Sequence, residues 1–201
     1  MKANQAAFDA GQLAQRLAEG YYTYLAAILV AADPRSDQLV PEVLPGQYVS
    51  IGKVKRKDGT EHTFHFTHYL HLARTDVVIA SELERVWFAG ALLRLGDVLT
   101  QHLYFDRAPE LELIYHLRNG IAHGNCFRID KPKKLTKFPA HNRDAWVKSD
   151  TEAMFEITAN LQGQPVLFDY MGAGDVLDAL ISVGMYLMKM GNGEPLRLKT
   201  R

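Results

Sequence analysis

The stretch "PELELIYHLRNGIAHGN", Pro109 to Asn125, decides the fold of this chain. Large apolar residues recur in it at every fourth position, at Leu113, Leu117 and Ile121. This spacing is typical of an α-helix with one buried face. Pro109 suits a first helical position, and Gly124 with Asn125 suits a helix end. We therefore expect a helix that begins at Pro109 and runs into the polar residues after Leu117.

Three further segments carry a helical period on either side of this stretch. They run from about Ala6 to Ala32, from about Thr75 to Leu103, and from an N-cap at Asp175 to Gly191. In the first, the expected buried stripe is Leu17, Tyr21, Leu25, Ile28 and Leu29. In the second it is Ile79, Leu83, Val86, Trp87, Gly90 and Leu93. Four helices of this kind predict a mainly α fold, an antiparallel four-helix bundle.

Two small β-hairpins are expected as insertions in the bundle. The first pairs residues 48–57 with 60–72 around Asp58-Gly59, a hairpin signal in which both turn positions have positive φ. The second pairs Met154 to Asn160 with Val166 to Tyr170. The 201 residues are then one domain, with insertions near 46–72 and 130–170.

Composition narrows the class of protein. The 23 basic and 23 acidic residues cancel, so net charge gives no sign of a nucleic-acid or membrane partner. Cys126 is the single cysteine and no signal peptide opens the chain, which favours a reducing cytoplasm. The longest apolar run, Tyr21 to Ala32, is too short to span a bilayer. We expect a cytoplasmic protein without membrane association.

Within the opening stretch, Arg118, Asn119 and His123 form a compact polar group. Asn119 and His123 lie about 40° apart on a helical wheel, so the amide can hydrogen-bond the imidazole and fix its tautomer. Arg118 lies about 140° from His123. One straight helix would not aim both at one atom. Either the helix distorts near Gly120 and ends by Gly124, or a second copy of the chain completes the site.

These residue types suit cleavage of a phosphodiester. A guanidinium matches phosphate oxygens and can stabilise the charge that builds on a pentacoordinate phosphorus. An imidazole can take the proton of a ribose 2′-hydroxyl or return one to the leaving 5′-oxygen. Such a reaction is metal-independent, needs no cofactor, and spares DNA because DNA lacks the 2′-hydroxyl.

The pattern R-N-x-x-x-H at a helix end, followed by Gly-Asn, resembles the HEPN superfamily, named for higher eukaryotes and prokaryotes nucleotide-binding. Arg118, Asn119 and His123 are the matching positions. The resemblance implies a four-helix bundle, a homodimer with two motifs facing each other, and a metal-independent endoribonuclease of toxin or antiviral-defence type, often with an antitoxin partner. It covers the helical skeleton and the motif, and both hairpins and the basic loop depart from a minimal unit. His123 would be the acid/base catalyst, Arg118 would contact the scissile phosphate, and Asn119 would orient His123.

Two other interpretations of the motif stay open. In the first, the same residues hold a nucleotide or a partner in a non-catalytic HEPN-like binding or interaction module. In the second, Arg118 is a solvated helix residue and His123 interacts with the carbonyl end of the helix dipole. His116 lies on the helix face of His123, and either lines the same cleft or packs in the core.

Basic clusters elsewhere are candidates for an RNA surface. One follows the motif closely and could guide an RNA backbone toward His123; it comprises Lys131, Lys133, Lys134 and Lys137. The others lie at Lys53, Lys55, Arg56 and Lys57, and at Arg197, Lys199 and Arg201. Clusters of this kind are usually solvated surface in a neutral protein.

A histidine run, "HTFHFTHYLHL", raises the question of a metal site. Its four histidines recur at every third position, at His62, His65, His68 and His71. In a strand, side chains three apart point to opposite faces, and two on one face lie about 20 Å apart. We therefore expect a polar strand face and no metal.

Overall fold

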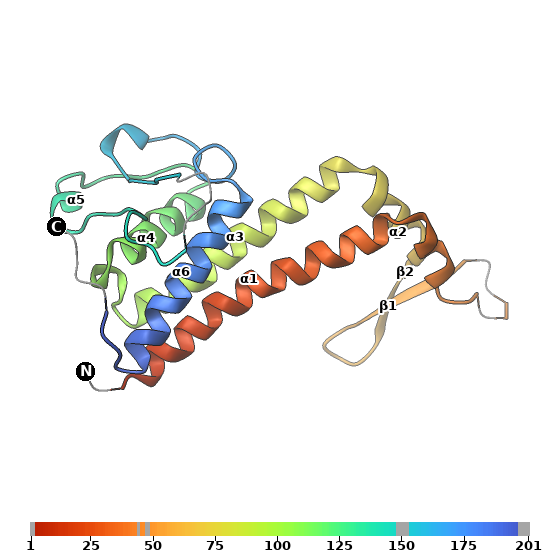
Figure 1. Ribbon diagram of the computed structural model, residues 1–201. Helices are drawn as coiled ribbons and strands as arrows, with labels where there is room; N and C mark the ends of the chain where they lie inside the picture. Colours follow the sequence, from red (N-terminus) through yellow and green to blue (C-terminus); the bar gives the residue numbers. More distant parts are fainter. Residues whose placement is uncertain (1–2, 44, 47–48, 148–152, 197–201) are drawn as a thin grey trace. The chain divides into compact units, whose positions relative to one another are not determined.

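The computed structural model describes residues 3–43, 45–46, 49–147 and 153–196 (Figure 1). It is mainly helical, as expected, with one two-stranded antiparallel hairpin where the sequence predicts two; the four-helix bundle stays a prediction. The α-helices are α1 (Gln5–Ala32), α2 (Phe66–Thr75), α3 (Val77–Gln101), α4 (Pro109–Ala122), α5 (Lys134–Lys137) and α6 (Ala173–Gly191). The strands are β1 (Ile51–Lys55) and β2 (Glu61–His65), and short 3-10 helices are η1 (Pro34–Leu39), η2 (Phe105–Arg107) and η3 (Ala159–Leu161).

The chain packs as two compact units. Unit 1 comprises residues 1–20 and 84–201, and unit 2 comprises residues 21–83. The expectation that all 201 residues form a single domain stays a prediction, and each unit is described by itself below.

The core of unit 1 lies between the first part of α1, the last part of α3, α4 and α6 (Figure 1). Small residues bring α1 close to α6, because a Cβ added at Gly11 would lie 2.6 Å from Met188 Cγ and 2.7 Å from the carbonyl oxygen of Gly184. α3 meets α1 through Trp87, whose Nε1 donates to the carbonyl oxygen of Leu17 at 3.4 Å. The large side chains in this core include Phe88, Leu92, Leu95, Leu111, Leu113, Leu117 and Leu180.

The buried faces of α1 and α3 differ from the expected stripes. α1 buries mostly small side chains, Ala7, Ala10, Ala14, Ala18 and Tyr21. Leu29, expected inside, is 65% exposed. α3 buries Phe88, Ala91, Leu92, Leu95 and Leu99, whereas Val86 is 66% exposed. Both helices carry apolar residues on more than one face, so periodicity alone does not select the face that packs.

Unit 2 holds the expected first hairpin, with register from Ile51 opposite His65 to Lys55 opposite Glu61. Its turn differs from the expected one, because Gly59 alone of the two turn residues has positive φ, at 84°. The Asp58 carboxylate accepts from the backbone N–H of Thr60 at 2.9 Å and fixes this turn. The expected second strand is also wrong beyond His65, since residues 66–72 belong to α2.

Arg74 ties α2 to the end of α1 within unit 2. Its Nε donates to the carbonyl oxygen of Ala31 at 2.5 Å, and its guanidinium pairs with Asp37 at 2.8 Å and with the Ser36 hydroxyl. The unit also exposes many large apolar side chains, including Leu29, Val30, Leu39, Val77 and Val78.

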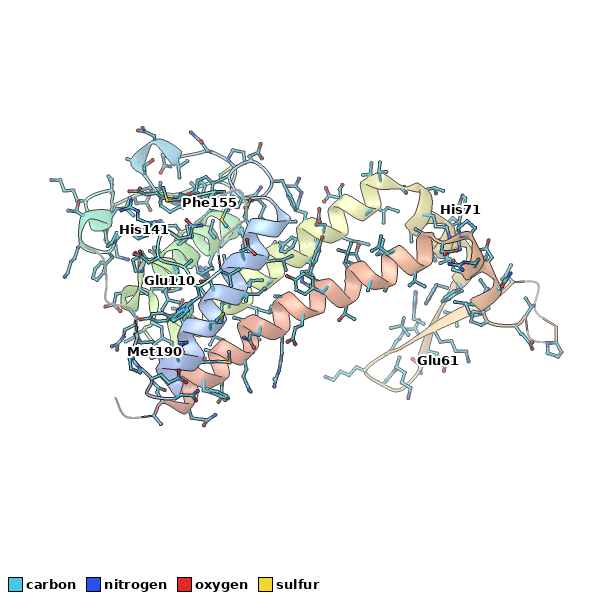
Figure 2. The ribbon with its side chains drawn as sticks, viewed as in Figure 1. Glu61, His71, Glu110, His141, Phe155 and Met190 are labelled. Carbon is cyan, nitrogen blue, oxygen red and sulfur yellow. The ribbon has the colours of Figure 1, made fainter. Side chains whose placement is uncertain are left out.

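The second expected hairpin is wrong. The two expected strands bond to other parts of the chain instead of to each other: the Ile157 N–H donates to the Ala140 carbonyl at 2.9 Å, and the Val166 N–H to that of Asn125 at 2.9 Å. Figure 2 shows Phe155 of this segment near Glu110 of α4, with which it lines one pocket; His141, from the chain before it, donates its N–H to the Pro109 carbonyl at 3.3 Å. Hydrogen bonds to the irregular chain that follows α4 therefore replace the local strand pairing.

The expected fourth helix is confirmed at its end, Gly191, and corrected at its start. α6 begins at Ala173, and Asp175 lies in its first turn instead of at the N-cap. The Asp175 carboxylate accepts from the N–H of Gly172 at 2.9 Å, which satisfies a donor at the helix start.

Candidate functional site

The motif lies at the carboxyl end of α4, as the sequence predicts. α4 runs without interruption from Pro109 to Ala122, and His123 is its C-cap. Gly124 and Asn125 then have φ of 84° and 63°, a left-handed turn that ends the helix. The distortion considered near Gly120 is absent, because the helix continues through this residue. Gly120 instead allows another part of the chain to pack closely against α4. A Cβ there would lie 2.4 Å from Val166 Cγ2.

An open cleft of about 310 Å³ lies beside this helix end. Its wall combines α4 with the irregular chain that follows it, and is lined by Tyr115, His116, Asn119, His123, Arg128, Ile129, Asp130, Lys131 and Lys134. Two of the three motif residues, Asn119 and His123, therefore face one cleft. Arg118 is not among the residues that line it.

His123 is exposed, and a substrate could reach its imidazole from solvent. Its backbone N–H donates to the carbonyl oxygen of Asn119 at 3.1 Å. Among the described residues, the structure contains no hydrogen bond between the two side chains. The expected role of Asn119 in orienting His123 therefore has no direct contact to support it in this conformation.

Arg118 turns toward α3 instead of toward the cleft. Its Nη2 and Nε lie 2.7 Å and 3.2 Å from Asp97 Oδ1, and its Nη1 donates to Asn119 Oδ1 at 3.3 Å. The stem of Arg118 packs on Gly96, where an added Cβ would come within 2.5 Å of Arg118 Cγ. In this chain, the guanidinium is thus an ion-pair partner of Asp97, and it contacts the cleft only through Asn119.

Lys134 fixes the basic segment to α4. Its Nζ lies 2.8 Å from Oε1 of the buried Glu112 and 4.3 Å from the ring centroid of Tyr115. A buried carboxylate paired with an ammonium group is far less costly than an unpaired one. Lys134 therefore holds the segment that forms one wall of the cleft.

His116 is buried in the cleft wall, next to the ion pair of Lys134 and Glu112. Burial, and secondarily the charge of Lys134, lowers its pKa to about 4. Its Nε2 lies 3.8 Å from Glu112 Oε1, too far for a hydrogen bond, and has no hydrogen-bond partner in the described structure. The imidazole is neutral near pH 7, so its contact with Glu112 is not an ion pair. Both expected positions of His116 are therefore correct: its side chain is buried in the core, and it also lines the cleft.

The four lysines of the basic segment have different surroundings. Lys131 and Lys134 line the cleft, whereas Lys133 and Lys137 do not. Lys137 lies 5.1 Å from the ring of Phe138. The cluster of Lys53, Lys55, Arg56 and Lys57 belongs to the hairpin of unit 2, and Arg197, Lys199 and Arg201 lie outside the described residues.

The histidine run is half strand and half helix, which corrects the expected all-strand segment. His62 and His65 belong to β2, whereas His68 and His71 belong to α2. Figure 2 labels His71. Across residues 3–43, 45–46, 49–147 and 153–196, no group of three or more His, Cys, Asp or Glu side chains could hold a metal ion.

Sequence reasoning missed several residues of the site. Tyr115, Arg128, Ile129 and Asp130 also line the cleft, and Asp97 holds Arg118. The four-residue spacing of Glu112 and His116 indicated that these two side chains lie next to each other on one helix face. Asp97 has no such signal, because it precedes Arg118 by 21 residues and lies on another helix.

In the described part of the chain, none of the helices has the length and apolar character needed to cross a membrane. Comparisons with protein-family models, with characterised proteins and with solved structures found no match to this chain. The resemblance to the HEPN superfamily therefore stands on the motif and its helix alone.

Proposed function

We propose that this protein is a metal-independent endoribonuclease of HEPN type, with unit 1 as its antiparallel four-helix bundle. The observation that carries the proposal is the shared cleft. An exposed imidazole, His123, faces it beside an amide, Asn119, and a cation, Lys131. Proton transfer and phosphate binding, the two requirements of RNA cleavage by the 2′-hydroxyl, thus have side chains at one place.

In the reaction, the ribose 2′-oxygen attacks phosphorus and the bond from phosphorus to the 5′-oxygen breaks. His123 takes the proton from the 2′-hydroxyl while solvent water protonates the departing 5′-oxygen, or His123 and water exchange these roles. The products are a 2′,3′-cyclic phosphate and a 5′-hydroxyl. Lys131 lies where it would attract the phosphate backbone. Lys134, paired with Glu112, holds the cleft wall.

Arg118 enters this mechanism in one of two ways. The resemblance assigns it to the scissile phosphate, and this requires either release from Asp97 or an Arg118 from the second chain of a homodimer. We retain the homodimer as part of the proposal. A toxin or defence role, with an antitoxin protein as partner, rests on the same resemblance.

The decisive experiment measures cleavage of a mixed-sequence RNA by purified protein in EDTA. His123→Ala is expected to lower the rate by about a hundredfold or more, because general acid–base catalysis typically contributes that much. The matched control is His62→Ala, an exposed histidine on β2 outside the cleft. Mass spectrometry of the products should find cyclic phosphate ends. Wild-type rates in folded His123→Ala protein would eliminate the proposal.

A non-catalytic nucleotide-binding or interaction module is the second candidate, and the pairing of Arg118 with Asp97 favours it. An arginine held by a carboxylate does not contact phosphate in the same conformation. In this case RNA or a nucleotide would bind in the cleft without being cleaved. His123→Ala would then change the binding affinity by no more than a few-fold, and neither protein would cleave RNA.

A further inference from the structure

The contacts of Arg118 fix the orientation of a neighbouring amide. The guanidinium has donors only, so the Asn119 atom that it approaches at 3.3 Å must be the acceptor, Oδ1. The other end of the amide, Nδ2, then points away from Arg118. Asn119 lines the cleft beside His123, and Nδ2 carries two N–H donors.

The position of Arg118 is itself determined by α3. Gly96 leaves room for the Arg118 stem, and Asp97 Oδ1 accepts from both Nε and Nη2. With two donors used in this way, the third group, Nη1, is directed to Asn119. A planar guanidinium transmits this orientation because its donors have fixed relative directions.

From this chain of contacts we propose that Asp97 and Arg118 are positioning residues, and that Asn119 Nδ2 donates a hydrogen bond to an anionic phosphate oxygen in the cleft. The inference rests on the proposed function for the identity of the anion as an RNA phosphate. It changes the role of Arg118 from direct phosphate contact to orientation of Asn119. It also changes the role of Asn119, from orienting His123 to binding the substrate.

The substitution Asn119→Asp separates these two roles of Asn119. An aspartate keeps an acceptor for Arg118 and could still accept from His123, but it has no N–H donors and adds a negative charge. If Asn119 binds phosphate, RNA affinity falls by roughly tenfold to a hundredfold, the range for a lost hydrogen bond to a charged group plus charge repulsion. If Asn119 only orients His123, the added charge alone lowers RNA affinity by at most a few-fold, and a loss no larger than this would overturn the inference.

The positioning role of Asp97 is tested by a second set of variants. Asp97→Asn is expected to weaken affinity for a 2′-O-methylated, uncleavable RNA by about two- to fivefold, because an exposed ion pair contributes little. Asp97→Glu keeps the carboxylate and is expected to restore most of the affinity. Asp169→Asn is the matched control, since Asp169 is exposed and does not line the cleft. Equal affinities for Asp97→Asn and Asp169→Asn would contradict the positioning role.

A nuclear magnetic resonance titration with inorganic phosphate tests the contact without any cleavage. In wild-type protein, phosphate is expected to shift the side-chain amide signals of Asn119, and Arg118→Lys should abolish this shift. Unmoved Asn119 signals would overturn the inference, whether or not those of His123 move. If Asn119 responds to phosphate but His123→Ala cuts RNA normally, the proposed function fails and the inferred anion contact stands.

Discussion

At the scale of single residues, the motif divides into an open part and a paired part. His123 is exposed at the cleft, whereas Arg118 is held by Asp97 on α3. Asn119 lies between them, because it accepts from Arg118 and lines the cleft. In this conformation the cleft therefore offers an imidazole and an amide. The arginine acts on them only through its hydrogen bond to the amide.

The basic segment offers a matched pair of lysines. Lys131→Ala is expected to weaken binding of a 2′-O-methylated RNA by about two- to fivefold and to reduce the salt slope by roughly one ion. Lys133→Ala removes the same charge two positions away, outside the cleft, and should change the affinity less. Affinity measured by fluorescence anisotropy at several salt concentrations decides the point. Equal losses in both variants would mean that the segment acts only as diffuse charge.

His116 makes the stability of the fold depend on pH. Burial lowers its pKa from 6.5 to about 4, so between these values the unfolded chain binds a proton that the folded chain does not. The free energy of unfolding is therefore unaffected by protonation of His116 above pH 6.5, where the imidazole is neutral in both states, and it falls as pH drops from 6.5 toward 4. The loss is roughly 3 kcal/mol, at 1.36 kcal/mol per pKa unit.

Urea unfolding at several pH values checks this prediction. His116→Gln, which carries no titrating group, should show a weaker decline of stability toward acid than the wild type. A smaller decline remains, because burial also lowers the pKa of His141. Equal pH dependence in both proteins would contradict the assignment to His116.

At the scale of elements, α4 determines the site because of how it ends. The left-handed turn at Gly124 and Asn125 sends the chain back along the helix, where the Cys126 N–H donates to the Gly120 carbonyl at 3.0 Å. The Asn125 side chain then accepts from the N–H of Leu167 at 2.9 Å. The following segment is thereby held against α4, and the cleft forms between them.

Two helical glycines offer a direct test of this packing. In Gly120→Ala, the new methyl would collide with Val166 Cγ2, and we expect a loss of about 1–3 kcal/mol in the free energy of unfolding. In Gly90→Ala, the methyl meets no atom within 4 Å, and we expect a gain of up to about 1 kcal/mol from helix propensity. Thermal and urea unfolding measure both. A neutral Gly120→Ala would show that the contact with Val166 relaxes freely.

At the scale of the whole molecule, the chain forms two compact units, and the described residues of the cleft all belong to unit 1. The proposed homodimer raises the question of whether Arg118 acts within its own chain or across to a partner. The contacts of Arg118 with Asp97 and Asn119 favour action within one chain.

Co-expression of two impaired variants tests this choice. Arg118→Ala and His123→Ala chains, purified together by different tags, should cleave no faster than Arg118→Ala alone when Arg118 serves the His123 of its own chain. If Arg118 acts across the dimer, one intact site forms in each mixed dimer, and cleavage returns to roughly half of the wild-type rate per dimer. Such recovery would overturn the single-chain role of Arg118.

The sequence by itself determined the features that depend on near neighbours. The fourfold spacing of apolar residues, Pro109 and Gly124 locate α4 and the motif at its end, and Asp58-Gly59 locates the hairpin. Each depends on backbone preferences over a few residues. The buried faces of α1 and α3 did not follow in this way, because both helices are apolar on several sides.

Only the tertiary structure decided which side chains meet. Asp97 pairs with Arg118, and Glu112 pairs with Lys134. Residues 153–171 bond to the irregular chain that follows α4 instead of forming the expected hairpin. These contacts join residues that lie far apart in the sequence, so no local period or turn signal encodes them. They form because packing of the helices buries Glu112 and brings the Gly96 surface of α3 against Arg118, where charged groups need partners.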